Sequence, residues 1–93
     1  MTRRLVCYDV TADARRRRAA TLLESYGRRL QQSVFVCRLT ALQERRLRDD
    51  LRALIDADAD ALAVLPLCAR CAEGAFTVGT QLDLTADPAC FIV

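Results

Sequence analysis

The 93-residue sequence contains no lysine, no histidine and no tryptophan, so all 14 of its basic residues are arginine. Without histidine, imidazole metal ligands and the Ser-His-Asp or Cys-His catalytic arrangements are excluded. Without lysine, Schiff-base chemistry and a phosphate-binding loop ending in lysine are excluded as well. Any catalysis must therefore use carboxylates, thiols, hydroxyls, arginines or a metal held by carboxylates.

Long apolar runs are also missing. The uncharged stretch 61–69 has only nine residues, whereas a membrane span needs about 18. The apolar run that follows Arg4 stops at Asp9, too early for a signal peptide. We therefore expect a cytoplasmic protein with no membrane partner. The length allows one domain over residues 1–93 with a single modest core.

Positive charge is concentrated in the first half of the chain. Residues 1–52 hold 13 arginines against six acids, a net charge of +7, whereas residues 53–93 hold one arginine against six acids, a net charge of −5. A basic half of this kind is typical of a surface that binds DNA or RNA. A GC-rich genome that encodes every surface cation as arginine explains the same composition, so charge alone leaves both interpretations open.

The five cysteines are odd in number and scattered, which does not favour a disulfide framework. Cys68 and Cys71 have the spacing of half a zinc site or of a redox pair. Only three other thiols are present, at strand-like positions, so small buried side chains are the favoured role.

Periodicity predicts a single sheet with two helices. Apolar, β-prone segments predict strands over 4–10, 30–39, 61–67, 75–79 and 90–93, and helical spacing predicts helices over about 14–26 and 41–56. The segment 30–39 is long enough to contain a bend that divides it into two strands, and periodicity leaves this open. Thr11 to Asp13 supply a turn and an N-cap for the first helix, and Gly27 ends it. Thr40 and Gln43 form a capping box for the second.

This order of elements favours an α+β ferredoxin-like β-α-β-β-α-β sandwich with an additional C-terminal strand. Both helices would cover the same face of the sheet. The opposite face would then be left without a helix. We expect a second copy of the chain to cover it in a homodimer.

Asp9 is the first candidate functional residue, near the C-terminal end of the first strand and inside an apolar run. A carboxylate there needs a partner, either loop N–H groups or a cation. One aspartate per chain is too few to hold Mg²⁺, but a two-fold axis would bring two copies together. Mg²⁺ suits such a sparse site because it keeps several waters and accepts substrate phosphates.

Four consecutive arginines form the second candidate feature, in the first turns of the first helix: Arg15, Arg16, Arg17 and Arg18. Cations at this end oppose the helix dipole, so stability alone would favour acids there. Beside free helix N–H groups, the same arginines would make a phosphate site. A solvated run of charge is the alternative.

Several motifs together resemble a known family. They are Tyr8-Asp9-Val10, Asp13 with the arginines, Leu22-Leu23-Glu24-Ser25-Tyr26-Gly27-Arg28, Gln31-Gln32-Ser33-Val34-Phe35, Pro66-Leu67-Cys68 with Cys71, and Phe91-Ile92-Val93. The sequence is similar to the small CRISPR-associated adaptation nuclease. That family provides the second of the two core spacer-acquisition proteins of this antiviral defence and is described as an endoribonuclease.

The resemblance implies a ferredoxin-like homodimer whose last strand, about 90–93, pairs with the partner subunit. The family's strand-end aspartate corresponds to Asp9, and two copies hold one Mg²⁺ for hydrolysis of phosphodiester bonds in RNA or DNA. Such a dimer also bridges two dimers of the CRISPR-associated integrase and holds duplex DNA between them. Val36 stands where several members carry glutamate, which removes one candidate acidic partner.

On this basis Asp9 is the expected catalytic and metal-binding residue. The residues expected to bind nucleic-acid phosphates are Arg15, Arg16, Arg17, Arg18 and Arg28, and those expected to line the site are Tyr8, Ser33 and Phe35. Three other functions stay open: a non-catalytic scaffold that positions DNA for the integrase, a toxin-like RNA interferase of similar fold, and a small-molecule regulatory dimer.

Overall fold

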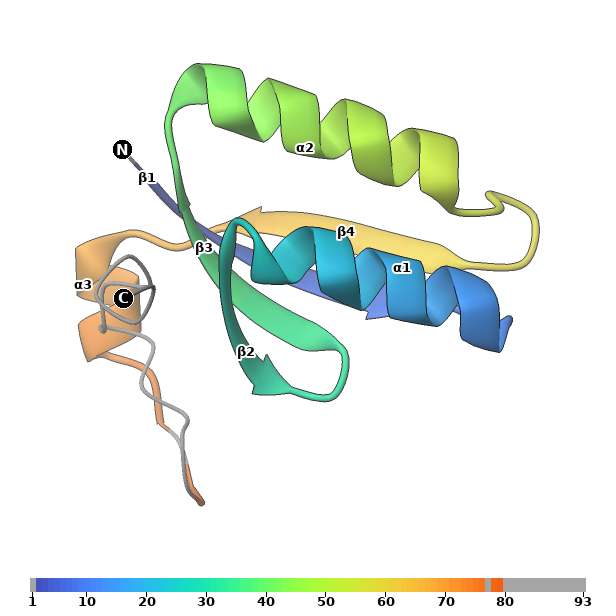
Figure 1. The fold of residues 1–93 in the computed structure, drawn as a ribbon. Helices are drawn as coiled ribbons and strands as arrows, with labels where there is room; N and C mark the ends of the chain where they lie inside the picture. Colours follow the sequence, from blue (N-terminus) through green and yellow to red (C-terminus); the bar gives the residue numbers. More distant parts are fainter. Residues whose placement is uncertain (1, 77, 80–93) are drawn as a thin grey trace.

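The computed structural model describes residues 2–76, 78 and 79. Four strands form one antiparallel sheet in the order β2-β3-β1-β4 (Figure 1). The elements follow one another as β1 (Thr2–Asp9), α1 (Asp13–Glu24), β2 (Gly27–Gln31), β3 (Val34–Leu39), α2 (Ala41–Leu54), β4 (Ala61–Pro66) and α3 (Ala69–Glu73). The predicted ferredoxin-like α+β fold is confirmed.

Helices α1 and α2 cover one face of the sheet and close the core against it. Alternate residues of β1, Val6 and Tyr8, point to this face and are buried. They pack in one cluster with Leu23 of α1 and with Leu47 and Leu51 of α2. Because successive strand residues point to opposite faces, Leu5, Cys7 and Asp9 lie on the other side of the sheet.

No helix among the described elements covers that second face. Helix α3 follows β4 past the end of the sheet rather than lying across it (Figure 1). Leu65 of β4 is the partner of Leu5 in the β1–β4 ladder, so both side chains point to this face, and Leu65 is 47% exposed. This face is therefore available for further contacts along β4, whereas Val36 of β3, which is the ladder partner of Leu5, is already fully buried.

The long strand predicted over 30–39 is divided in two. Strand β2 ends at Gln31, and β3 begins at Val34 after a two-residue turn. Gly27 does not end α1, which stops at Glu24, but opens β2 instead. A Cβ atom at Gly27 would lie 2.1 Å from the carbonyl oxygen of Val36, so the hairpin itself requires glycine there.

The two long helices begin differently. The predicted capping box of α2 is confirmed: the Gln43 N–H donates to Thr40 Oγ1 at 3.2 Å, and the Thr40 N–H donates to Gln43 Oε1 at 2.8 Å. The predicted side-chain cap of α1 is wrong, because Ala12 is its N-cap residue. The hydroxyl of Thr11 bonds to Asp60 instead, at 3.2 Å.

The chain after β4 departs most from the prediction. The short helix α3 was not predicted, and residues 75, 76, 78 and 79 do not form the strand expected there. The last predicted strand, 90–93, lies outside the described residues. None of the described helices is long and apolar enough to cross a membrane.

Candidate nucleic-acid and metal site

Asp9 is the last residue of β1 and lies on the sheet face without helices. Its backbone is level with Ala61, the first residue of β4. The side chain is exposed, and within the described part of the chain its carboxylate makes no ion pair and accepts no loop N–H. The N–H capping considered from the sequence is therefore not observed, and both carboxylate oxygens are open to an external ligand.

The three residues expected to line the site lie in different places. Tyr8 and Phe35 face the helices, where their rings stack with centroids 6.3 Å apart and both are buried. The Tyr8 hydroxyl donates to the carbonyl oxygen of Gln32 at 3.3 Å. Tyr8 and Phe35 therefore hold β1 against the hairpin turn from the face opposite Asp9.

Ser33 is placed beside the end of β1 by its backbone. Its carbonyl oxygen accepts the Tyr8 N–H at 3.1 Å, immediately before Asp9. Through this hydrogen bond Ser33, which is half-buried, lies next to the strand end that carries Asp9. The rings of Tyr8 and Phe35 instead point to the other face of the sheet.

Two of the four consecutive arginines are used inside the fold. Arg15 Nε donates to Asp60 Oδ2 at 2.9 Å, and its Nη2 donates to Asp60 Oδ1 at 3.2 Å. Arg16 bonds to the Asp13 carboxylate and donates to the carbonyl oxygen of Val10 at 3.0 Å. These contacts tie the start of α1 to the ends of β1 and of the loop before β4.

Asp60 was not recognised as a functional or structural residue from the sequence. Its side chain is fully shielded and also accepts the N–H groups of Thr11 and Asp56, at 3.0 and 2.9 Å. The hydrogen bond from Arg15, followed by those two N–H groups, holds the pKa of the Asp60 carboxyl well below its usual range. No short-range pattern marks it, because Arg15 lies 45 residues earlier.

Arg17 and Arg18 are the other two members of the arginine run, and both are exposed. Neither side chain makes an ion pair within residues 2–76. Both residues come directly after Arg15 and Arg16, whose contacts with Asp60 and Val10 hold the start of α1 close to the end of β1. They are the members of the run that can contact an external phosphate without breaking a contact of the fold.

Arg28 shares the sheet face of Asp9 but not its immediate surroundings. The ladder places Arg28 opposite Val36, and Val36 opposite Leu5. Arg28 is therefore two strands across and four residues back from Asp9, about 16 Å by ordinary strand spacing. Contacts to both residues would need an extended polyanion.

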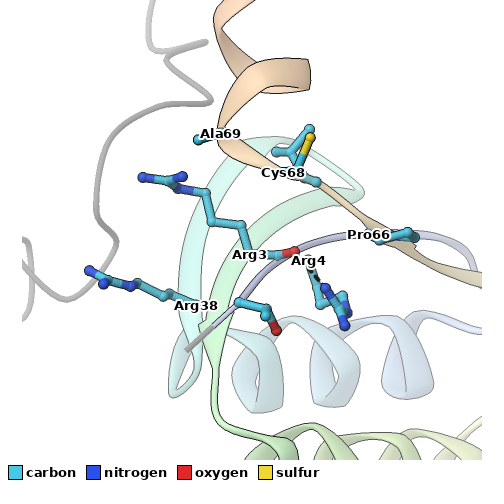
Figure 2. Close-up of a pocket in the computed structure, with 8 residues that line it drawn as sticks. Arg3, Arg4, Arg38, Pro66, Cys68 and Ala69 are labelled. Atoms are coloured by element: carbon cyan, nitrogen blue, oxygen red, sulfur yellow. Dashed lines mark hydrogen bonds between the residues drawn. The ribbon is translucent and has the colours of Figure 1, made fainter.

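A second group of arginines surrounds a pocket at the other end of β1, and the sequence had not marked it. The pocket has a volume of about 340 Å³, and Figure 2 shows Arg3, Arg4 and Arg38 around it with Cys68. Arg3 and Arg38 are directly opposite in the β1–β3 ladder. Arg4 points to the helices and pairs with Glu44 at 2.6 Å. The sequence signal that could have found this group is the alternation of side-chain direction along β1, which sends Arg3 and Arg4 to opposite faces of the sheet.

The described residues contain no group of three or more histidine, cysteine, aspartate or glutamate side chains that could hold a metal ion. Asp9 alone offers one carboxylate. Within the described residues, a magnesium ion at Asp9 would therefore have a single protein carboxylate as its ligand.

The molecule so far is a small α+β protein with one sheet, a carboxylate on the face without helices and exposed arginines on the helix that covers the other face. The model of the CRISPR associated protein Cas2 family matches residues 1–74, and the chain belongs to this family. The family resemblance seen in the sequence motifs is thereby confirmed.

Individual relatives agree with this assignment. The chain is 43% identical over 76 residues to a CRISPR-associated endoribonuclease Cas2 of Chloroflexus aurantiacus, covering 81% of this chain and 82% of the relative. It is similar to Streptococcus pyogenes Cas2, with a TM-score of 0.75 and 30% identity over 83% of this chain and 99% of that one. A chain from a partial Cas6-RT-Cas1–Cas2 complex matches with a TM-score of 0.78 and 25% identity, covering both chains fully.

Proposed function

We propose that this chain acts as a homodimeric, Mg²⁺-dependent phosphodiesterase on RNA or DNA, with the Asp9 carboxylates of two copies as the metal ligands. The observation that carries the proposal is the exposed Asp9 carboxylate, unpaired within the described residues, on the face without helices. Carboxylate oxygens are the ligands that Mg²⁺ prefers. The endoribonuclease name of the Chloroflexus relative supports the same reaction class.

In this proposal some residues bind the substrate, and others keep the elements around Asp9 in position. Bound Mg²⁺ would orient a water and offset charge on the scissile phosphate. Arg17 and Arg18 bind flanking phosphates, and Arg28 reaches phosphates farther along the strand. Arg15 and Arg16 hold the helix start beside Asp9. With no histidine or lysine in the chain, water must protonate the leaving oxygen, and turnover is expected to be slow.

Substitution of Asp9 tests the catalytic proposal. Asp9→Ala is expected to lower Mg²⁺-dependent hydrolysis about a hundredfold or more while duplex binding stays within about twofold. Asp50→Ala is the matched control, since Asp50 is also an exposed aspartate without an ion pair in the described structure but lies on α2. Hydrolysis that survives Asp9→Ala, or a protein that sediments as a monomer at working concentration, would contradict the proposal.

A second function is a scaffold that positions DNA and bridges two dimers of the CRISPR-associated integrase. The likeness to a chain from a complex that contains Cas1 favours it, as do exposed arginines in excess of what one scissile phosphate needs. The two functions can coexist in one dimer. Spacer acquisition that persists in Asp9→Ala while hydrolysis is lost would assign the biological role to the scaffold.

The arginines are tested by the salt dependence of duplex binding. The double variant Arg17→Ala/Arg18→Ala is expected to reduce the slope of log K against log salt by about 1 for each phosphate that the variant no longer neutralises. Arg45→Ala/Arg46→Ala removes the same charge from α2 and is expected to leave the slope nearly unchanged. Equal effects of the two double variants would show that net charge alone, and not the start of α1, determines binding.

A further inference from the structure

Cys68 and Cys71 lie outside the Asp9 site and have no role in the function proposed above. Both side chains are exposed, and their Sγ atoms are 3.1 Å apart. Cys68 is the N-cap residue of α3 and Cys71 lies in its first turn, so the local helical geometry brings the thiols together. The role of small buried side chains predicted for this pair is therefore wrong.

The two thiols are chemically unequal. The hydrogen bond between the two thiols lowers the pKa of Cys68, and the Cys71 backbone N–H, which donates to the Cys68 sulfur at 3.3 Å, adds to the effect. The same thiol–thiol hydrogen bond raises the pKa of Cys71. Cys37 differs from both, since burial raises its pKa to about 12. Cys68 is thus the more acidic, accessible nucleophile, with Cys71 beside it.

We propose that Cys68 and Cys71 form a redox-active dithiol that closes to an internal disulfide by exchange with a low-molecular-weight disulfide. The Cys68 thiolate attacks one sulfur of the small disulfide, forms a mixed disulfide and releases the first small thiolate. Cys71 then loses its proton to water, and its thiolate attacks the Cys68 sulfur and releases the second. The cysteine pair gives up two electrons, and the small disulfide is reduced to two thiols.

The geometry favours this reaction over metal binding. Closing the bond requires the sulfurs to approach by about 1 Å from their 3.1 Å separation. A structural zinc site uses four ligands. The described residues place no further cysteine, aspartate or glutamate with this pair to make a group of three. Figure 2 shows Cys68 where the chain leaves β4 for α3, a position open to small molecules.

The proposal is tested on the full chain carrying Cys90→Ser, which removes the one thiol outside the described residues. The protein is equilibrated with oxidised and reduced glutathione at neutral pH, alkylated and digested with trypsin. Trypsin cleaves after Arg70, between the two cysteines, so the expected disulfide keeps the two flanking peptides joined in the mass spectrum. Cys37 should remain reduced, because it is buried and its pKa is raised.

A single variant separates the two roles. In the same background, Cys71→Ser should accumulate a stable glutathione adduct on Cys68, because no second thiol is left to resolve it, whereas the protein with both thiols should end as the internal disulfide. Separate peptides with free thiols at every glutathione ratio would overturn the proposal. A glutathione adduct that persists on Cys68 while Cys71 is present would also do so, as would stoichiometric zinc that protects the pair from oxidation. None of these outcomes depends on nuclease activity.

Discussion

Replacing Gly27 by alanine is expected to destabilise the protein by about 3 kcal/mol. An ideal Cβ atom there lies 2.1 Å from the Val36 carbonyl oxygen and 2.8 Å from both Cα and Sγ of Cys37, whereas ordinary contact begins at 3.4 Å. Strand β2 must therefore move by about 1 Å from β3. Overpacking costs about 1–3 kcal/mol, and weakening one or two ladder hydrogen bonds costs about 1 kcal/mol each.

Urea denaturation followed by far-ultraviolet circular dichroism measures this loss. With a slope near 1 kcal/mol per molar urea for a domain of this size, the midpoint should fall by about 3 M. Gly74→Ala is the matched control, because its Cβ would meet the Arg70 carbonyl oxygen at an ordinary 3.5 Å and its φ is −83°. That variant should gain about 0.4–1 kcal/mol. Equal midpoints for the two variants would refute the close-contact reasoning.

Three further substitutions test other parts of the fold. Leu51→Ala empties a fully buried position and should lower the free energy of unfolding by about 2–5 kcal/mol in the same urea experiment. Thr40→Ala removes the α2 cap and should cost about 1 kcal/mol, whereas Thr21→Ala, on the exposed face of α1, should change little. Asp60→Asn should destabilise the protein at neutral pH by weakening the contact with Arg15. Because the folded-state pKa of Asp60 is lowered, its contribution is complete above the unfolded pKa of about 3.9 and decreases as pH falls further. The stability difference between Asp60→Asn and the unsubstituted protein should therefore shrink below about pH 4, and a constant difference would argue against that role.

The sequence was informative wherever the cause of structure is local. The capping box joins Thr40 to Gln43 three residues later, so it is visible in the sequence and is observed. The position of Asp9 at the end of a strand follows from the apolar run before it. The opposite orientations of Tyr8 and Asp9 were also accessible, because Val6, Tyr8 and Val10 alternate with a period of two.

Other features depend on contacts between distant segments. Arg15 and Asp60 are 45 residues apart, and only folding shows that part of the arginine run holds loops instead of facing solvent. The requirement for Gly27 arises from the close approach of β3, although the residue reads locally as a helix stop.

By itself, the sequence determined the two long helices, the capping box of α2, the strand-end carboxylate and the excess of arginine, since each can be read without knowing which distant segments pack together. Only the tertiary structure decided which arginines stay available, which sheet face carries Asp9 without a helix above it, and that Cys68 and Cys71 are exposed. The physical reason is that burial and ion pairing are set by which segments pack together. That packing joins positions that no short pattern connects.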